Sequence, residues 1–295
     1  MAYITDDEIR RHYYLGSRDN GPSQRLTGNV VLINLYVNDM TGNWMYPGHM
    51  QLCQQEINRA AYLLMQTAAM HGAPLMIQQI YQVINVPAYA TPYSREWLSF
   101  IFAQYGQTSA AGMQRYFKSY YHCDEAPIMI LLNSDQRSYA QAANGTWIGV
   151  DEFSVVYRYG GRYDYHAYMH ELLHQFGAVD YYYPDITVAA ANRYFPYSIM
   201  YMNGDDIDDL TRYLIGWTNT LTENARGFLA ETKTLNAYVI QQALAAEHAK
   251  GMGGGYGGGY GGYGGGYGGY GGGWGGYGGG WGGFGGGWGG GFGGF

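Results

Sequence analysis

The chain has little cysteine, little charge and no long apolar run. Among its 295 residues only 2 are cysteine, and Asp, Glu, Lys and Arg together make up 13%. Cys53 and Cys123 are too few for a disulfide framework, and they could be two free thiols or one bridge. Because no run of about eighteen apolar residues exists, we expect no transmembrane helix.

Basic residues are also scarce, with 16 Lys and Arg against 23 Asp and Glu and a net charge of -7. This balance argues against nucleic acid as the main partner. The first eleven residues include Asp6, Asp7 and Glu8 and have no apolar core, so they are not a secretory signal. We therefore expect a cytoplasmic protein, a protein exported without such a leader, or one whose export signal has been removed.

Glycine and aromatic residues are abundant, and they are concentrated at the C-terminus. After Met252 the sequence is glycine with an uncharged aromatic residue every three or four positions. Ordering so much glycine is entropically costly, so residues 251–295 are expected to form a flexible tail that self-associates weakly. The tail lacks the glycine–aspartate repeat of calcium-binding β-rolls. An inert linker is the plainer alternative.

The sequence divides into three parts. Residues 1–27 are polar and contain turn-forming glycine and proline, which indicates an N-terminal arm over the surface. Residues 28–250 are long enough for a single core and are expected to form one globular domain with C-terminal helices at 219–249. The tail described above follows it.

Apolar patterning predicts a mixed α/β (α+β) fold for the domain. Val30–Val37 and Leu75–Val86 are predicted strands, and residues 49–70 between them have helical spacing. A helix between two strands predicts a parallel pair. Further elements follow in chain order: helices at Ser94–Tyr105 and Ser109–Tyr121, and strands at Pro127–Leu132, Thr146–Val150 and Phe153–Tyr159.

The most informative stretch runs from His170 to Asp180. On a helix, His170 and His174 project from one face and supply half of a tetrahedral zinc site. Glu171 can act as general base on a metal-bound water. Gly177 favours a helix end, and the resulting turn would deliver Asp180 as a third ligand. Three protein ligands leave one position for water, which is typical of catalytic zinc.

Two other interpretations of this stretch need to be weighed. A bare HExxH motif occurs often by chance, although the added glycine and aspartate make chance much less credible. His166 lies four residues before His170 and could compete for the metal. The spacing to Asp180 explains the pattern better, and Asp185 is the other nearby carboxylate.

A second motif, Ser198-Ile199-Met200-Tyr201, lies downstream. The two motifs together resemble the metzincin zinc peptidases, in particular the HExxHxxGxxD subgroup that includes the snapalysins. The resemblance covers residues 28–217. It implies a twisted mixed sheet over helices, with the zinc helix below a cleft. It also implies a methionine turn in which Met200 forms an apolar floor under the zinc.

The resemblance implies further roles near the site. Tyr201 could donate a hydrogen bond to the oxyanion, although related patterns have tyrosine two residues after the methionine, where this chain has Met202. Gly145–Val150 is the expected edge strand that would pair with an extended peptide substrate. Tyr181–Tyr183 would begin a loop toward the methionine turn. The acidic residues of 205–209 are expected to cap a helix within Asp205–Trp217.

The sequence therefore predicts a Zn²⁺-dependent endopeptidase acting on peptide or protein substrates. One alternative is a non-enzymatic assembly or adhesion protein with a vestigial zinc site, acting through its aromatic tail. Another is a metal site that serves stability only. Glu171 favours the enzyme, because a structural site has no need of a base.

Overall fold

The computed structural model describes residues 21–92, 94–141, 152–158, 161–182, 185–201 and 204–232. Within these residues, one five-stranded sheet has the order β2-β1-β3-β5-β4. β1 is parallel to β2 and β3, β3 is parallel to β5, and β4 is antiparallel to β5, which makes the sheet mixed. The strands are β1 Gly28–Asn38, β2 Leu75–Asn85, β3 Ile128–Asp135, β4 Tyr139–Gln141 and β5 Phe153–Arg158.

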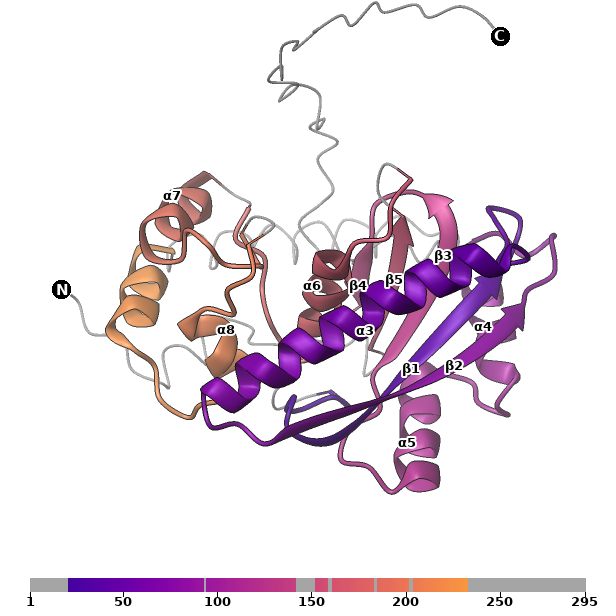
Figure 1. Ribbon diagram of the computed structural model, residues 1–295, viewed down its shortest axis with the longest axis horizontal. Helices are drawn as coiled ribbons and strands as arrows, with labels where there is room; N and C mark the ends of the chain where they lie inside the picture. The colour runs from indigo at the N-terminus through magenta and orange to yellow at the C-terminus, as the bar shows by residue number, and fades with distance from the viewer. Residues whose placement is uncertain are drawn as a thin grey trace, which may run out of the picture.

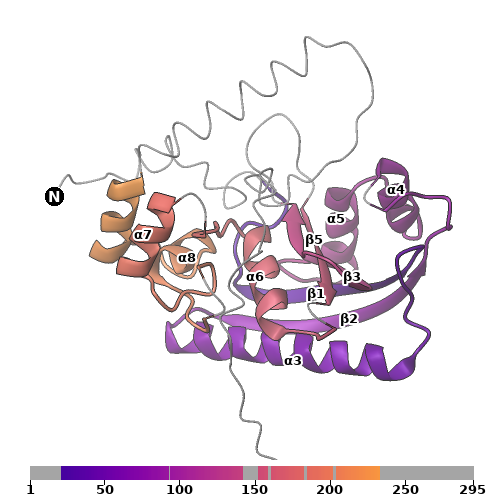
Figure 2. The ribbon, with the colours of Figure 1, turned by 90° about the horizontal axis from the view of Figure 1, so that it is seen from above.

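Helices cover both faces of this sheet. α3 (Pro47–Met70) runs along one face, and α4 (Arg95–Ala103) and α5 (Ala110–Tyr121) lie on the other (Figure 2). Successive side chains of a strand point to opposite faces, so β1 contributes alternately to two cores. Val30 and Leu32 pack with the α3 side, whereas Val31 and Ile33 pack with the α4 and α5 side. β1 is therefore buried on both faces.

The first strand–helix–strand unit confirms the prediction for this region. β1 and β2 pair in parallel from Gly28 opposite Leu75 to Asn38 opposite Asn85, and α3 connects them. α3 buries Ile57 and Leu64 against the sheet, as its apolar spacing predicts. No helix among the described residues is both long enough and apolar enough to cross a membrane.

The edge strand that the structure describes is short. The edge strand in the described part is β4, Tyr139–Gln141, which pairs antiparallel with β5. The expected edge, Gly145–Val150, lies outside the described residues, and it includes the strand predicted at Thr146–Val150. A three-residue strand leaves no periodic pattern in a sequence, which explains why β4 was not predicted.

Of the remaining helices, α6 (Tyr165–Gln175) packs against β4, β5 and α3, and α7 (Asp185–Tyr194) and α8 (Asp209–Leu214) lie beyond it at one end of the molecule (Figure 1). Residues 223–232 are also helical. The sequence predicts only a loop where α7 lies, so that prediction is incomplete. α8 is shorter than the expected Asp205–Trp217, because Asp208 is its N-cap.

Both cysteines are free in the structure. Cys53 is fully buried on α3, and its Sγ lies 3.1 Å from the hydroxyl of Tyr168 on α6. Cys123 is half-buried. The described end of the N-terminal arm packs into the domain, with Ser23 and Leu26 buried.

Candidate metal centre

α6 is fixed to the sheet by a buried polar network. The side chain of Gln175 donates to the Ile128 carbonyl at 3.0 Å and accepts from the Ile128 N–H at 3.2 Å. It also donates to the Ser154 hydroxyl at 2.7 Å, which in turn donates to the Glu171 carbonyl at 2.7 Å. Buried polar groups in such a network hold an element in one position, so α6 presents its side chains from a rigid base.

The end of α6 is set by Gly177, as predicted. Its φ of +97° lies in the left-handed region that glycine favours. The Gly177 N–H donates to the His174 carbonyl at 3.0 Å, and the Ala178 N–H donates to the Leu173 carbonyl at 3.1 Å. These paired bonds are the Schellman motif, which ends a helix and reverses the chain. The turn brings Asp180 back toward the histidines.

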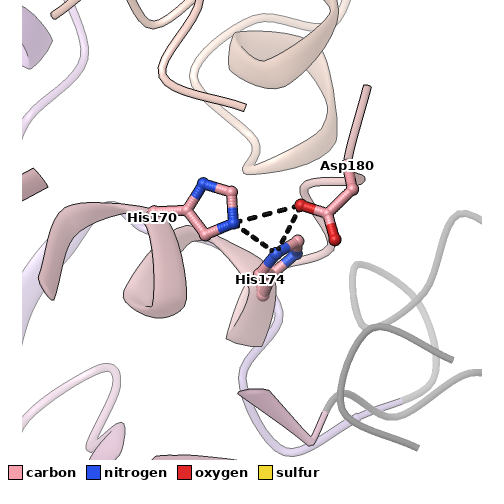
Figure 3. Close-up of side chains that lie close together, drawn as sticks. All are labelled: His170, His174 and Asp180. Carbon is pink, nitrogen blue, oxygen red and sulfur yellow. Dashed lines mark hydrogen bonds and ion pairs between the residues drawn. The ribbon is translucent and has the colours of Figure 1, made fainter. Parts of the chain in front are cut away.

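Three side chains converge at this point, as Figure 3 shows. Asp180 Oδ1 lies 3.0 Å from His170 Nε2 and 3.0 Å from His174 Nε2. The two Nε2 atoms are themselves 3.0 Å apart. The side chains of His170 and Asp180 are each 16% exposed and that of His174 is 10% exposed, so the group is sheltered and still reachable from solvent.

Backbone carbonyls orient both imidazoles. His170 Nδ1 lies 3.0 Å from the Ile199 carbonyl, and His174 Nδ1 lies 2.8 Å from the Ala178 carbonyl. A carbonyl can only accept, so each Nδ1 carries a proton and each Nε2 faces the shared point.

The atoms at the centre of the cluster attract positive charge. Asp180 Oδ1 is buried and lies 3.0 Å from each of the two Nε2 atoms. Two nitrogen lone pairs and one carboxylate oxygen at this spacing repel one another unless a proton or a metal cation lies between them. The donor set, two imidazoles and one carboxylate, is one that could hold a divalent metal ion.

The pKa values of the cluster reflect the same attraction for positive charge. Burial alone would raise the pKa of Asp180, but the positive charges and hydrogen bonds of His174 and His170 when protonated lower it well below its usual range. Burial alone would lower the pKa of His174, but the carboxylate of Asp180 raises it.

Glu171 lies beside the cluster and is not part of it. Its side chain is buried, and its Oε2 has no hydrogen-bond partner among the described residues. Burial raises the pKa of this carboxyl to about 8, opposed by the charge of His170. An unpartnered buried carboxylate oxygen is costly, and such groups are concentrated at functional sites.

The segment Ser198–Tyr201 forms a turn beside His170 of α6. Its Ile199 carbonyl is the partner of His170, so this turn helps to orient a candidate ligand. Ser198 Oγ donates to the N-cap carboxylate of Asp208 at 2.6 Å, which ties the turn to α8. Met200 is fully buried.

One alternative ligand, His166, lies outside the cluster. The ring nitrogens of His166 face Asp164 and Asp205, each at 3.0 Å, so His166 is not among the converging side chains. Tyr201 is half-buried, and its N–H donates to the Ser198 carbonyl at 3.1 Å.

Sequence reasoning missed two side chains next to the cluster. The Tyr182 hydroxyl donates to Asp180 Oδ2 at 2.6 Å, and Arg137 donates to the same hydroxyl at 3.1 Å. Arg137 follows the end of β3, far from Tyr182 in the chain. The aromatic run that begins at Tyr181 was a weak signal for Tyr182, but nothing in the sequence pointed to Arg137.

Comparison with known proteins adds no relationship to this description. No protein-family model matches the chain, and no curated protein matches it. The interpretation of the site therefore depends on its own geometry and on the resemblance of its motifs.

Proposed function

We propose that the protein is a zinc-dependent endopeptidase. The observation that carries this proposal is the convergence of His170 Nε2, His174 Nε2 and Asp180 Oδ1 beside the unpartnered carboxylate of Glu171. The first three could hold a metal ion, and the fourth is placed to exchange protons.

The spacing of the donor atoms supports zinc. Tetrahedral zinc binds imidazole nitrogen and carboxylate oxygen at about 2.0–2.2 Å, which places neighbouring ligand atoms about 3.3 Å apart. The three atoms lie 3.0 Å apart, so small side-chain shifts suffice for the fit. The cluster contains three potential ligands among the described residues, whereas structural zinc sites have four protein ligands. This count favours catalysis over a purely structural role.

The chain's own residues supply the remaining parts of a hydrolysis mechanism. A zinc ion at such a site polarises a carbonyl and lowers the pKa of a water molecule. The Glu171 carboxylate would take the proton from the attacking water and later pass it to the leaving amine. Its burial keeps competing bulk water away from that proton.

The edge of the sheet supports a peptide as substrate. β4 pairs with β5 on one side, and no described strand pairs with it on the other. Backbone groups on the edge of a sheet can pair with an extended peptide. β4 also packs against α6, the helix that carries the histidines, so a peptide on this edge would run past the metal candidates.

The competing proposal is an assembly protein that works through its tail. It is favoured by the glycine and aromatic composition of residues 251–295, which suits weak self-association. It gives no reason for a buried, unpartnered carboxylate at Glu171 beside three converging donors. We therefore place it second.

Metal analysis of the purified protein, paired with cleavage of a peptide library, tests the proposal. We expect about one zinc per chain and cleavage that stops when a chelator removes the metal and returns when zinc is added. Protein that contains zinc and cleaves no peptide would favour the assembly protein. Protein that takes up no divalent metal would contradict the whole assignment.

A further inference from the structure

The hydrogen bonds of Asp180 point to a positioning role for two residues outside the metal cluster. A carboxylate has two equivalent oxygens, and either one, or both, can bind a metal ion. In this structure Oδ1 faces the two histidines, whereas Oδ2 accepts a hydrogen bond of 2.6 Å from the Tyr182 hydroxyl. The two oxygens of Asp180 thus have different partners.

We propose that Tyr182, held by Arg137, fixes Asp180 as a ligand through Oδ1 alone and thereby sets the metal affinity of the site. This inference rests on the proposed function. A hydrogen bond to Oδ2 stops the carboxylate from rotating and occupies the oxygen that would otherwise compete for the metal. Partners of this kind commonly change metal affinity by about 10- to 100-fold.

The orientation of Tyr182 is itself well determined. The Arg137 guanidinium donates to the Tyr182 hydroxyl at 3.1 Å and lies 5.7 Å from the centre of its ring. Because the hydroxyl oxygen accepts from Arg137, its single proton is directed to Asp180. The Tyr182 ring also stacks on that of His170, at 6.2 Å between centres and 24° between planes.

This arrangement also connects the metal candidates to the edge of the sheet. Arg137 lies between β3 and β4, two residues before Tyr139, where the edge strand begins. The chain of contacts therefore runs from β4 through Arg137 and Tyr182 to Asp180. A ligand residue delivered by a turn gains a second anchor, in an element distant in sequence.

The test is Tyr182→Phe in the full chain, with zinc affinity measured by competition against a chromophoric chelator. Phenylalanine keeps the ring stacked on His170 and removes only the hydroxyl. We expect zinc to bind about 10-fold more weakly or worse, with peptide cleavage restored at saturating zinc. Tyr197→Phe is the matched control, because Tyr197 is 76% exposed, and it should leave the affinity unchanged.

A double-mutant cycle separates positioning from general packing. Asp180→His replaces the carboxylate by a ligand with no second oxygen, so adding Tyr182→Phe to it should cost almost nothing. An equal loss in both backgrounds, or no loss in the Tyr182→Phe single variant, would overturn the positioning role and leave the zinc proposal standing. A wild-type chain without zinc affinity would overturn both.

Discussion

Glu171 lies beside the metal candidates, and its buried Oε2 has no hydrogen-bond partner among the described residues. Glu171→Gln preserves size and cannot accept the proton, so we expect zinc content to stay normal and peptide cleavage to fall more than about 100-fold. Zinc content and kcat/KM are the measurements. The exposed Glu223→Gln is the control and should behave like wild type. Near wild-type turnover in Glu171→Gln would remove this carboxylate from the mechanism.

Asp180 is the one candidate ligand that lies outside the HExxH motif. We expect Asp180→Ala to weaken zinc binding strongly, because two imidazoles alone hold the ion poorly. Asp180→His should retain metal, since imidazole is an equally good ligand. Zinc stoichiometry and affinity by chelator competition check both variants. The exposed Asp206→Ala is the control, and unchanged affinity in Asp180→Ala would show that another residue completes the site.

At the level of single residues, the sequence predicts the candidate metal ligands far better than the groups that hold those ligands in position. His170, His174 and Asp180 were predictable because helix geometry and one turn bring them together. The carbonyls that orient the imidazoles were not predictable, because every residue has a carbonyl. Arg137 was missed for a different reason: its contact with Tyr182 exists only after the sheet has formed.

The turn after α6 is the element that joins the histidines to Asp180. Gly177 has φ of +97°, where a Cβ costs about 1–2 kcal/mol. We expect Gly177→Ala to lower the free energy of unfolding by about that amount and also to weaken zinc binding, because the Ala178 carbonyl orients His174. Denaturant unfolding and chelator competition measure the two effects.

Gly106→Ala is the matched control for the turn. Its φ of +65° gives a similar backbone penalty, and a Cβ there would meet nothing within 4 Å. We expect similar destabilisation with normal zinc affinity. If Gly177→Ala also kept normal zinc affinity, the shape of this turn would not matter to the site.

Elements with long, regular patterns were predicted, whereas α7 and the three-residue β4 were not. β1, α3 and β2 have apolar runs and helical spacing that leave few alternatives. α7 was missed because it follows Pro184 and an aromatic run, which are typical of a loop. The pairing of β4 with β5 depends on tertiary contacts that no local pattern records.

For the whole molecule, the sharpest prediction concerns residues 251–295. If the catalytic domain is complete by Lys250, deleting the tail should leave the melting temperature, zinc content and cleavage of a short peptide unchanged. Self-association should fall, because uncharged aromatic residues on glycine stack between chains but cannot build a core. Calorimetry and sedimentation velocity measure these effects.

The control for the deletion is a variant of full length with an altered tail. Replacing the tail's aromatic residues with serine keeps the length and removes stacking, so it should reduce self-association as the deletion does. Unfolding of the domain on deletion, or loss of short-peptide cleavage, would place the tail within the fold and contradict the boundary at Lys250.

The three candidate ligands all come from residues 170–180, and this closeness affects how metal and folding are coupled. An unfolded chain keeps such ligands near one another, because closing a short loop costs little entropy. The unfolded chain can therefore also bind zinc. It binds more weakly than the folded chain, in which the Ile199 carbonyl and the fixed turn hold the ligands in place. Metal stabilises a fold only by the ratio of the two affinities. Zinc should accordingly load early, while the chain is still folding, and raise the free energy of unfolding by less than its affinity for the folded site suggests.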